Sequence, residues 1–94
     1  MKTEQRERTK FRAWITKYAL TAGIKEIEAE DRFDISETMI SDIGDKYGAL
    51  YHGRDWHRTP EAAVDRASEM RDAKIISLQK QIIKLKAMTF GIKP

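Results

Sequence analysis

The apolar positions of this chain follow two different periods, which predicts two kinds of secondary structure. In FRAWITKYAL, residues 11–20, apolar and aromatic side chains alternate as they do in a β-strand. The predicted faces of this strand are Phe11, Ala13 and Ile15 on one side and Trp14, Thr16, Tyr18 and Leu20 on the other. Beyond residue 60 the apolar residues recur at intervals of three and four, which is typical of an α-helix. The pattern therefore predicts a sheet followed by a long helix.

A β-hairpin is expected at the start of the sheet. Ala22 and Gly23 form a turn signal, and the segment IKEIEAE follows at residues 24–30. We predict that residues 13–21 pair with residues 24–30 in this hairpin. The alternative for residues 24–30 is a helix, because Lys, Glu and Ala are good helix formers.

Two shorter strands are expected before the helix. Met39, Ile40 and Ile43 indicate one of them, and GDKYG after it indicates a turn. ALYH, residues 49–52, alternates again, and Gly53 marks a bulge or a bend. The predicted fold class is α+β: a small antiparallel sheet of three or four strands, open or curled like a small barrel, followed by one long C-terminal α-helix.

The helix has clear start and stop signals. Thr59 is a good N-cap, Pro60 suits the first helical position, and Glu61 complements the positive end of the helix dipole. No further glycine or proline occurs before Gly91. The predicted helix therefore covers residues 59–90 and is about 45 Å long at 1.5 Å per residue.

The predicted helix has two apolar segments of different character. The first contains small residues suited to close packing on a sheet: Ala62, Ala63, Val64, Ala67 and Met70. In the second, Ile75, Leu78, Ile82 and Leu85 repeat with the 3-4-3 spacing of a coiled-coil seam, and Ile76 and Ile83 widen it. We call these six residues the stripe. Since strands of five or six residues reach only about 20 Å, we expect the helix to cover the strands as far as about Met70 and then to project.

Two interpretations of the stripe stay open from the sequence. The stripe completes the core of the domain itself, or it is a self-association surface that makes the protein a homodimer. The seam is barely two heptads long, which is too short for a stable free coiled coil.

Length and composition define the class of protein. The chain has 94 residues, 35% of them charged, which suits one small domain. We divide it into a flexible basic arm at 1–10 and a single α+β domain at 11–94, with its sheet region at 11–58.

The absence of cysteine excludes disulfides and thiolate metal sites and favours a reducing cytoplasm. No signal peptide and no apolar run long enough to span a membrane are recognisable.

The charge is unevenly distributed along the chain. The formal net charge is only +3, yet both ends are basic, whereas residues 24–46 are rich in acidic side chains. Such polarity favours head-to-tail self-contact or a charged partner.

The segment YHGRDWHRTP, residues 51–60, is the densest group of functional side chains. Its candidates for a partner-binding surface are Tyr51, His52, Arg54, Asp55, Trp56 and His57. Trp, Tyr and Arg are enriched at interface centres, but the same residues also suit a purely structural strand-to-helix corner. The two histidines and Asp55 match no standard metal-site spacing, and no nucleophile, phosphate loop or carboxylate pair accompanies them. We therefore expect no enzyme activity, no metal and no cofactor.

Nucleic acid is an alternative partner. Basic and aromatic residues are neighbours at Arg12 and Trp14, at Lys17 and Tyr18, and at Arg54 and Trp56, and they could contact phosphates and stack on bases. The acidic central segment argues against this interpretation.

Several segments resemble short open reading frames of bacteriophages and prophages. They are KYALTAGI at the first strand, the helical segment that begins DWHRTPEAAVDRASEMRDAKI and continues ISLQKQIIKL, and MTF after it. The resemblance covers residues 14–90 and brings no catalytic residues with it. It implies a small accessory protein in the cytoplasm of a bacterial host that binds a host protein or complex. Inhibition of a defence system, such as a CRISPR effector or a restriction-type nuclease, would fit; a structural or assembly protein is the further alternative.

Overall fold

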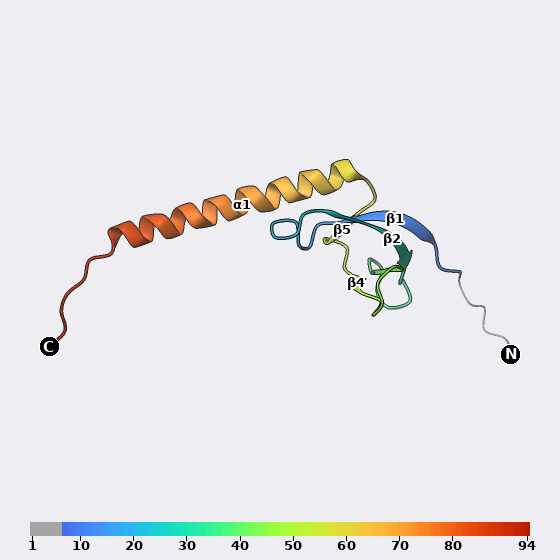
Figure 1. The fold of residues 1–94 in the computed structure, drawn as a ribbon, viewed down its shortest axis with the longest axis horizontal. Helices are drawn as coiled ribbons and strands as arrows, with labels where there is room; N and C mark the ends of the chain where they lie inside the picture. The colour runs from blue at the N-terminus through green and yellow to red at the C-terminus, as the bar shows by residue number, and fades with distance from the viewer. Residues whose placement is uncertain (1–6) are drawn as a thin grey trace.

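The computed structural model describes residues 7–94, which form five β-strands followed by one α-helix (Figure 1). The elements are β1 (Lys10–Ile15), β2 (Lys25–Asp31), β3 (Ile40–Asp42), β4 (Leu50–Tyr51), β5 (Trp56–His57) and α1 (Pro60–Ala87). The predicted α+β class is confirmed, with five strands in place of three or four. Most of the predicted basic arm, residues 1–6, lies outside the described residues.

The sheet is antiparallel throughout, in the strand order β4-β3-β2-β1-β5. The predicted hairpin exists, but its first strand ends at Ile15, which pairs with Lys25. The prediction that residues 16–21 belong to this strand is wrong, because the backbone turns on itself there: Ala22 N donates to Tyr18 O at 2.8 Å. The helical alternative for residues 24–30 is also wrong, since β2 is bonded to both β1 and β3.

The core lies inside the curl of the sheet and is built by strand residues. Its buried members are Ala13, Ile15, Ile27, Ala29, Ile40 and Tyr51, with Phe11, Ala49 and Trp56 packed against them. The alternation predicted for β1 is confirmed on its inward face, because Ala13 and Ile15 are buried and Phe11 joins the core. Burial of alternate residues along each strand is the driving force that closes this small sheet.

The helix begins where the sequence predicts. Thr59 is the N-cap, and its Oγ1 accepts a hydrogen bond from Ala62 N at 3.1 Å. The helix ends at Ala87, three residues before the predicted end, and Met88 is extended. Thr89 and Phe90 have a lower helix propensity than the residues before them, which favours this earlier end.

Only the first part of α1 packs on the sheet, where it contacts β1 and β5. Ala63 is buried and residues 66–68 and 70 are half-buried, whereas every residue from Arg71 onward is exposed. Ala62 and Val64 are also exposed, so their predicted packing on the sheet is wrong. The molecule is consequently elongated, 78 × 34 × 23 Å, with the second half of α1 extending away from the sheet (Figure 1). The predicted division of the helix near Met70 is confirmed.

Candidate functional site

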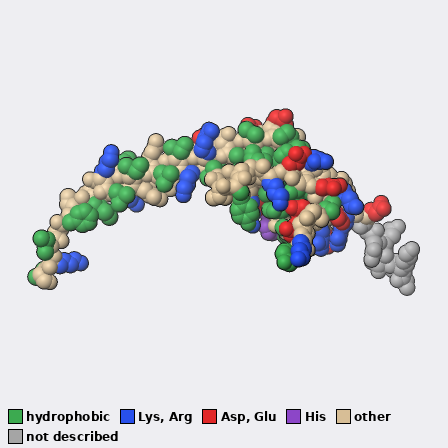
Figure 2. All heavy atoms as spheres, viewed as in Figure 1, with side chains coloured by type: hydrophobic (Ala, Val, Ile, Leu, Met, Phe, Trp, Pro, Cys, Tyr) green, Lys and Arg blue, Asp and Glu red, His purple; other side chains and the backbone are tan. Residues whose placement is uncertain are grey.

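The stripe on the second half of α1 is the most prominent exposed apolar feature of the described chain. Its six residues, Ile75, Ile76, Leu78, Ile82, Ile83 and Leu85, are between 43% and 66% exposed. Figure 2 shows hydrophobic side chains along the whole projecting part of the helix, interrupted by lysines. The interpretation that the stripe completes the core of its own domain is therefore wrong. The reason is geometric, because the sheet ends before the stripe begins.

The segment before α1 is divided between the core and the surface. Tyr51 lies in the core and is only 8% exposed. The ring of Trp56 packs 5.5 Å from that of Phe11, and its Nε1 donates to the carbonyl oxygen of Thr38 at 2.8 Å. The ring pair of Phe11 and Trp56, together with this hydrogen bond, stabilises the strand-to-helix corner. His52 and Arg54, in contrast, are exposed.

Arg58 stacks over the aromatic pair of this corner. Its guanidinium carbon lies 4.3 Å from the ring centroid of Phe11 and 5.4 Å from that of Trp56. Cation–π contacts of this kind stabilise by about 0.5–1 kcal/mol at exposed sites. Arg58 is not among the residues predicted to bind a partner, although its position directly after the aromatic segment is a usable signal in the sequence.

His57 is the titratable group of the segment with the most distinctive surroundings. Its Nε2 lies 3.0 Å from Oγ1 of Thr16, which is buried. Burial lowers the pKa of His57, the positive charge of Arg66 lowers it further, and Asp55 partly opposes them. Burial and the charge of Arg66 therefore both favour the neutral form of His57 over its imidazolium.

The described residues contain no group of three or more His, Cys, Asp or Glu side chains that could hold a metal ion. Asp55 has a structural contact instead, since its carbonyl oxygen accepts a hydrogen bond from Thr16 N at 2.9 Å.

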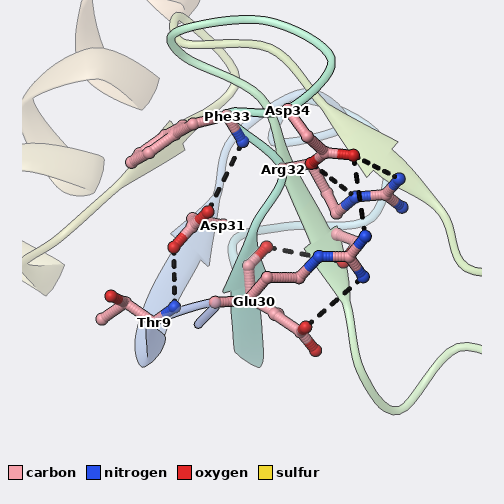
Figure 3. A network of polar contacts seen from close by, with 8 residues as sticks. Thr9, Glu30, Asp31, Arg32, Phe33 and Asp34 are labelled. Carbon is pink, nitrogen blue, oxygen red and sulfur yellow. Dashed lines mark hydrogen bonds and ion pairs between the residues drawn. The ribbon is translucent and has the colours of Figure 1, made fainter. Parts of the chain in front are cut away.

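The basic side chains near β1 lie beside carboxylates. Arg12 Nη1 lies 3.1 Å from Glu26 Oε1. Arg8 lies 3.6 Å from both Glu30 and Asp34 (Figure 3). Phosphate binding at these arginines would have to compete with the neighbouring carboxylates, which disfavours this side of the sheet as a nucleic-acid surface.

Asp31 anchors the segment before β1. This carboxylate is fully buried and accepts hydrogen bonds from Thr9 N at 2.6 Å and from Phe33 N at 3.5 Å (Figure 3). The backbone N–H of Asp31 in turn donates to Thr9 O at 3.0 Å. A buried carboxylate needs such donors to offset its desolvation. This role of Asp31 could not be predicted from the sequence, because nothing local distinguishes it from the neighbouring acidic residues.

A pocket of about 260 Å³ lies beside the turn between β1 and β2. Its lining includes Tyr18, Ile24 and Lys25. Lys25 Nζ lies 3.6 Å from Asp42 Oδ2, so the ammonium group already has an anionic neighbour.

Comparisons with protein-family models, with curated protein sequences and with solved structures find no match to this chain. No helix of the described residues combines the length and the apolar character needed to cross a membrane. The geometry defines an α+β protein with a curled five-stranded antiparallel sheet and one long projecting helix. The stripe is its strongest candidate for a functional surface.

Proposed function

We propose that this protein acts by stoichiometric protein binding, not by catalysis, and that the stripe on α1 is its principal binding surface. The exposure of six large apolar side chains outside the core carries the proposal. Full burial of a fully exposed side chain of this size is worth roughly 1.5–3 kcal/mol, and about half of that is left for each of these half-exposed side chains. Their exposure in the isolated chain is still a substantial source of binding energy.

The biological role that we propose is that of a small phage-type accessory protein inside a bacterial host. Such a factor would inhibit a defence nuclease by occupying part of its surface. The resemblance of residues 14–90 to phage reading frames supports this role. A binder needs no reactive group, and the projecting helix offers a contact surface that the sheet leaves uncovered.

Affinity capture from bacterial lysate tests the proposal. The tagged protein is compared with Ile82→Glu/Leu85→Glu and with the control Ala73→Glu/Ser77→Glu. The control adds the same charge to exposed helix positions outside the stripe. We expect the wild type and the control to retain a host protein near equimolar ratio after nuclease treatment, and the stripe variant to lose it.

Two outcomes would contradict the proposed function. Equal capture by the stripe variant and the wild type would exclude the stripe as the binding surface. Capture that disappears with nuclease, together with affinity that falls linearly in a log–log plot against salt, would identify nucleic acid as the partner instead.

A further inference from the structure

The seam within the stripe has the symmetry that pairing with itself requires. Ile75, Leu78, Ile82 and Leu85 follow a 3-4-3 spacing, which reads the same in both chain directions. If two copies of α1 cross antiparallel near residue 80, Ile75 faces Leu85 of the second copy and Leu78 faces Ile82 of the second copy. All four seam residues of each copy then enter the interface.

The side chains that flank the seam fit the same arrangement. One flank is Asp72, Gln79 and Lys86, and the other flank is Lys74 and Gln81. In an antiparallel pair, positions of the same flank meet, so Asp72 faces Lys86 of the second copy, twice by symmetry. Gln79 and Gln81 each face their own counterpart, and Lys74 lies opposite the end of the second helix at Ala87. Opposite charges therefore meet and like charges do not.

A parallel pair would use the same seam without this complementarity. Flank positions five residues apart then meet, which places Asp72 opposite Ala67 and Lys86 opposite Gln81. A parallel pair would also bring both sheets to the same end of the helices. The antiparallel pair keeps them at opposite ends of an already elongated molecule.

The sheet of the same chain does not cover the seam. The side chains of α1 that it covers most are Ala63, Ala67 and Met70, and the covered part of the helix ends there. Every residue from Arg71 onward, including the whole seam, is exposed. Ile76 and Ile83 lie on the other side of the seam, away from the sheet.

We propose that the molecule bound by the seam is a second copy of this chain, in an antiparallel pair of α1 helices centred near residue 80. This rests on the proposed function, because it concerns the same stripe: the second copy occupies the seam in the free protein and competes there with the host protein. Since the seam covers only residues 75–85, the interface is smaller than the 1,200–2,000 Å² of stable complexes. We expect a monomer–dimer equilibrium with a dissociation constant on the order of 10 µM.

Disulfide trapping distinguishes the two directions, because the natural chain contains no cysteine. Leu78→Cys and Ile82→Cys are prepared separately and oxidised alone and as a mixture. In the antiparallel pair these positions face each other, so the mixed disulfide dominates. Predominant linkage of Leu78→Cys to itself would overturn the antiparallel arrangement. Linkage no faster than that of the exposed control Ser77→Cys would overturn the pair altogether.

Charge exchange tests the flanking pair in solution by sedimentation equilibrium. Asp72→Lys and Lys86→Asp should each weaken dimerisation by about 3–10-fold, because two like-charged contacts arise per dimer. The double exchange should restore the wild-type constant to within about twofold. Asp72 also pairs with Arg71 at 3.1 Å within the chain, and Lys86→Asp cannot restore that contact. Recovery in the double variant would therefore come from the contacts between copies and would support the antiparallel register, and a double variant weaker than both single variants would contradict it.

A matched pair of variants separates the seam from the rest of the stripe. Ile82→Ser/Leu85→Ser should abolish the dimer, whereas Ile76→Ser/Ile83→Ser, which also removes two exposed apolar side chains, should weaken it far less. Equal loss in both variants would overturn the assignment of the seam. A wild type that stays monomeric above 500 µM would overturn the inference while the proposed function stands, provided that Ile82→Glu/Leu85→Glu still loses its host protein. Dimerisation of the wild type without capture of any host protein would support the inference and contradict the proposed function.

Discussion

Gly53 lies directly against Thr38, so that a Cβ atom at position 53 would stand 2.8 Å from the Thr38 Cβ and 3.1 Å from its Oγ1. The carbonyl oxygen of Thr38 also accepts the 2.8 Å hydrogen bond from Trp56. The loop before β3 thus contacts the β4–β5 connection at Gly53 and β5 at Trp56. The bend predicted at Gly53 is confirmed, since Asp55 N donates to His52 O at 2.9 Å across it, and Gly53 is also a position of close approach.

Gly53→Ala is expected to destabilise the protein by about 1–3 kcal/mol, because the added methyl group meets a Cβ atom that cannot move without the backbone. Gly44→Ala is the matched control. Its added Cβ would meet only Asp42 Oδ1, at 3.5 Å, so the free energy of unfolding should change by less than about 1 kcal/mol. Urea unfolding followed by circular dichroism measures both, and equal effects would contradict the close approach.

Asp31 is expected to be the most important carboxylate for stability among those in Figure 3. Asp31→Ala should cost about 2–4 kcal/mol, because the N–H groups of Thr9 and Phe33 lose a charged acceptor in a buried position. Asp31→Asn keeps one acceptor oxygen and should cost less. The control Asp34→Asn, which weakens the exposed pairs with Arg32 and Arg8, should cost about 0–1 kcal/mol in the same urea titration. A cost at Asp34 that equals the cost at Asp31 would contradict this ranking.

His57 is expected to make stability depend on pH near neutrality. Its pKa is lowered in the folded protein, mainly by burial, so the unfolded chain binds more protons between that pKa and about 6.5. The contribution of His57 to the free energy of unfolding therefore rises with pH through this window. It is present above about pH 6.5 and is lost as the pH falls towards the pKa of the folded state.

Replacement of His57 by Gln should flatten the dependence of the free energy of unfolding on pH between about pH 5 and 7. The matched control is His52→Gln, which removes the exposed imidazole and leaves the contact between His57 and Thr16 in place. Urea unfolding at several pH values measures the slopes. Identical slopes for the wild type and His57→Gln would show that packing against Thr16 and Arg66 leaves the histidine unaffected.

Elements with a local signal were predictable from the sequence. The alternation of β1 and the Thr59-Pro60 start of α1 depend on neighbouring residues, so the pattern alone locates them. β5 has only two residues, and its partner β1 lies some forty positions earlier, as in the contact of His57 with Thr16. No periodicity can mark such a strand, because its pairing is decided by tertiary contacts.

The spacing of the stripe residues was predictable from the sequence, but their exposure to solvent was not. A buried helix face and an interface helix need the same spacing of Ile75, Leu78, Ile82 and Leu85. The difference depends on where the sheet ends, and that position follows from the early end of β1 at Ile15 and the short β4 and β5. Burial of Asp31 likewise depends on Thr9 and on β2 together.

Removal of residues 73–94 is expected to leave the sheet folded. None of these residues is buried, and the core cluster consists of strand residues only. The shortened helix keeps its Thr59 cap and the covered residues Ala63, Ala67 and Met70. Circular dichroism and NMR spectra should therefore retain the signals of the sheet. An unfolded product would show that the second half of α1 stabilises the domain itself.

Thermal unfolding of the same truncated chain also tests self-association. A dimer gains stability by mass action, so the melting temperature of the full chain should rise by several degrees between about 10 and 500 µM. The truncated chain lacks the seam, and its melting temperature should stay constant over this range. The Ala73→Glu/Ser77→Glu variant keeps the seam and should behave like the full chain. A melting temperature of the full chain that does not change with concentration would show that the exposed stripe of α1 does not bind a second copy.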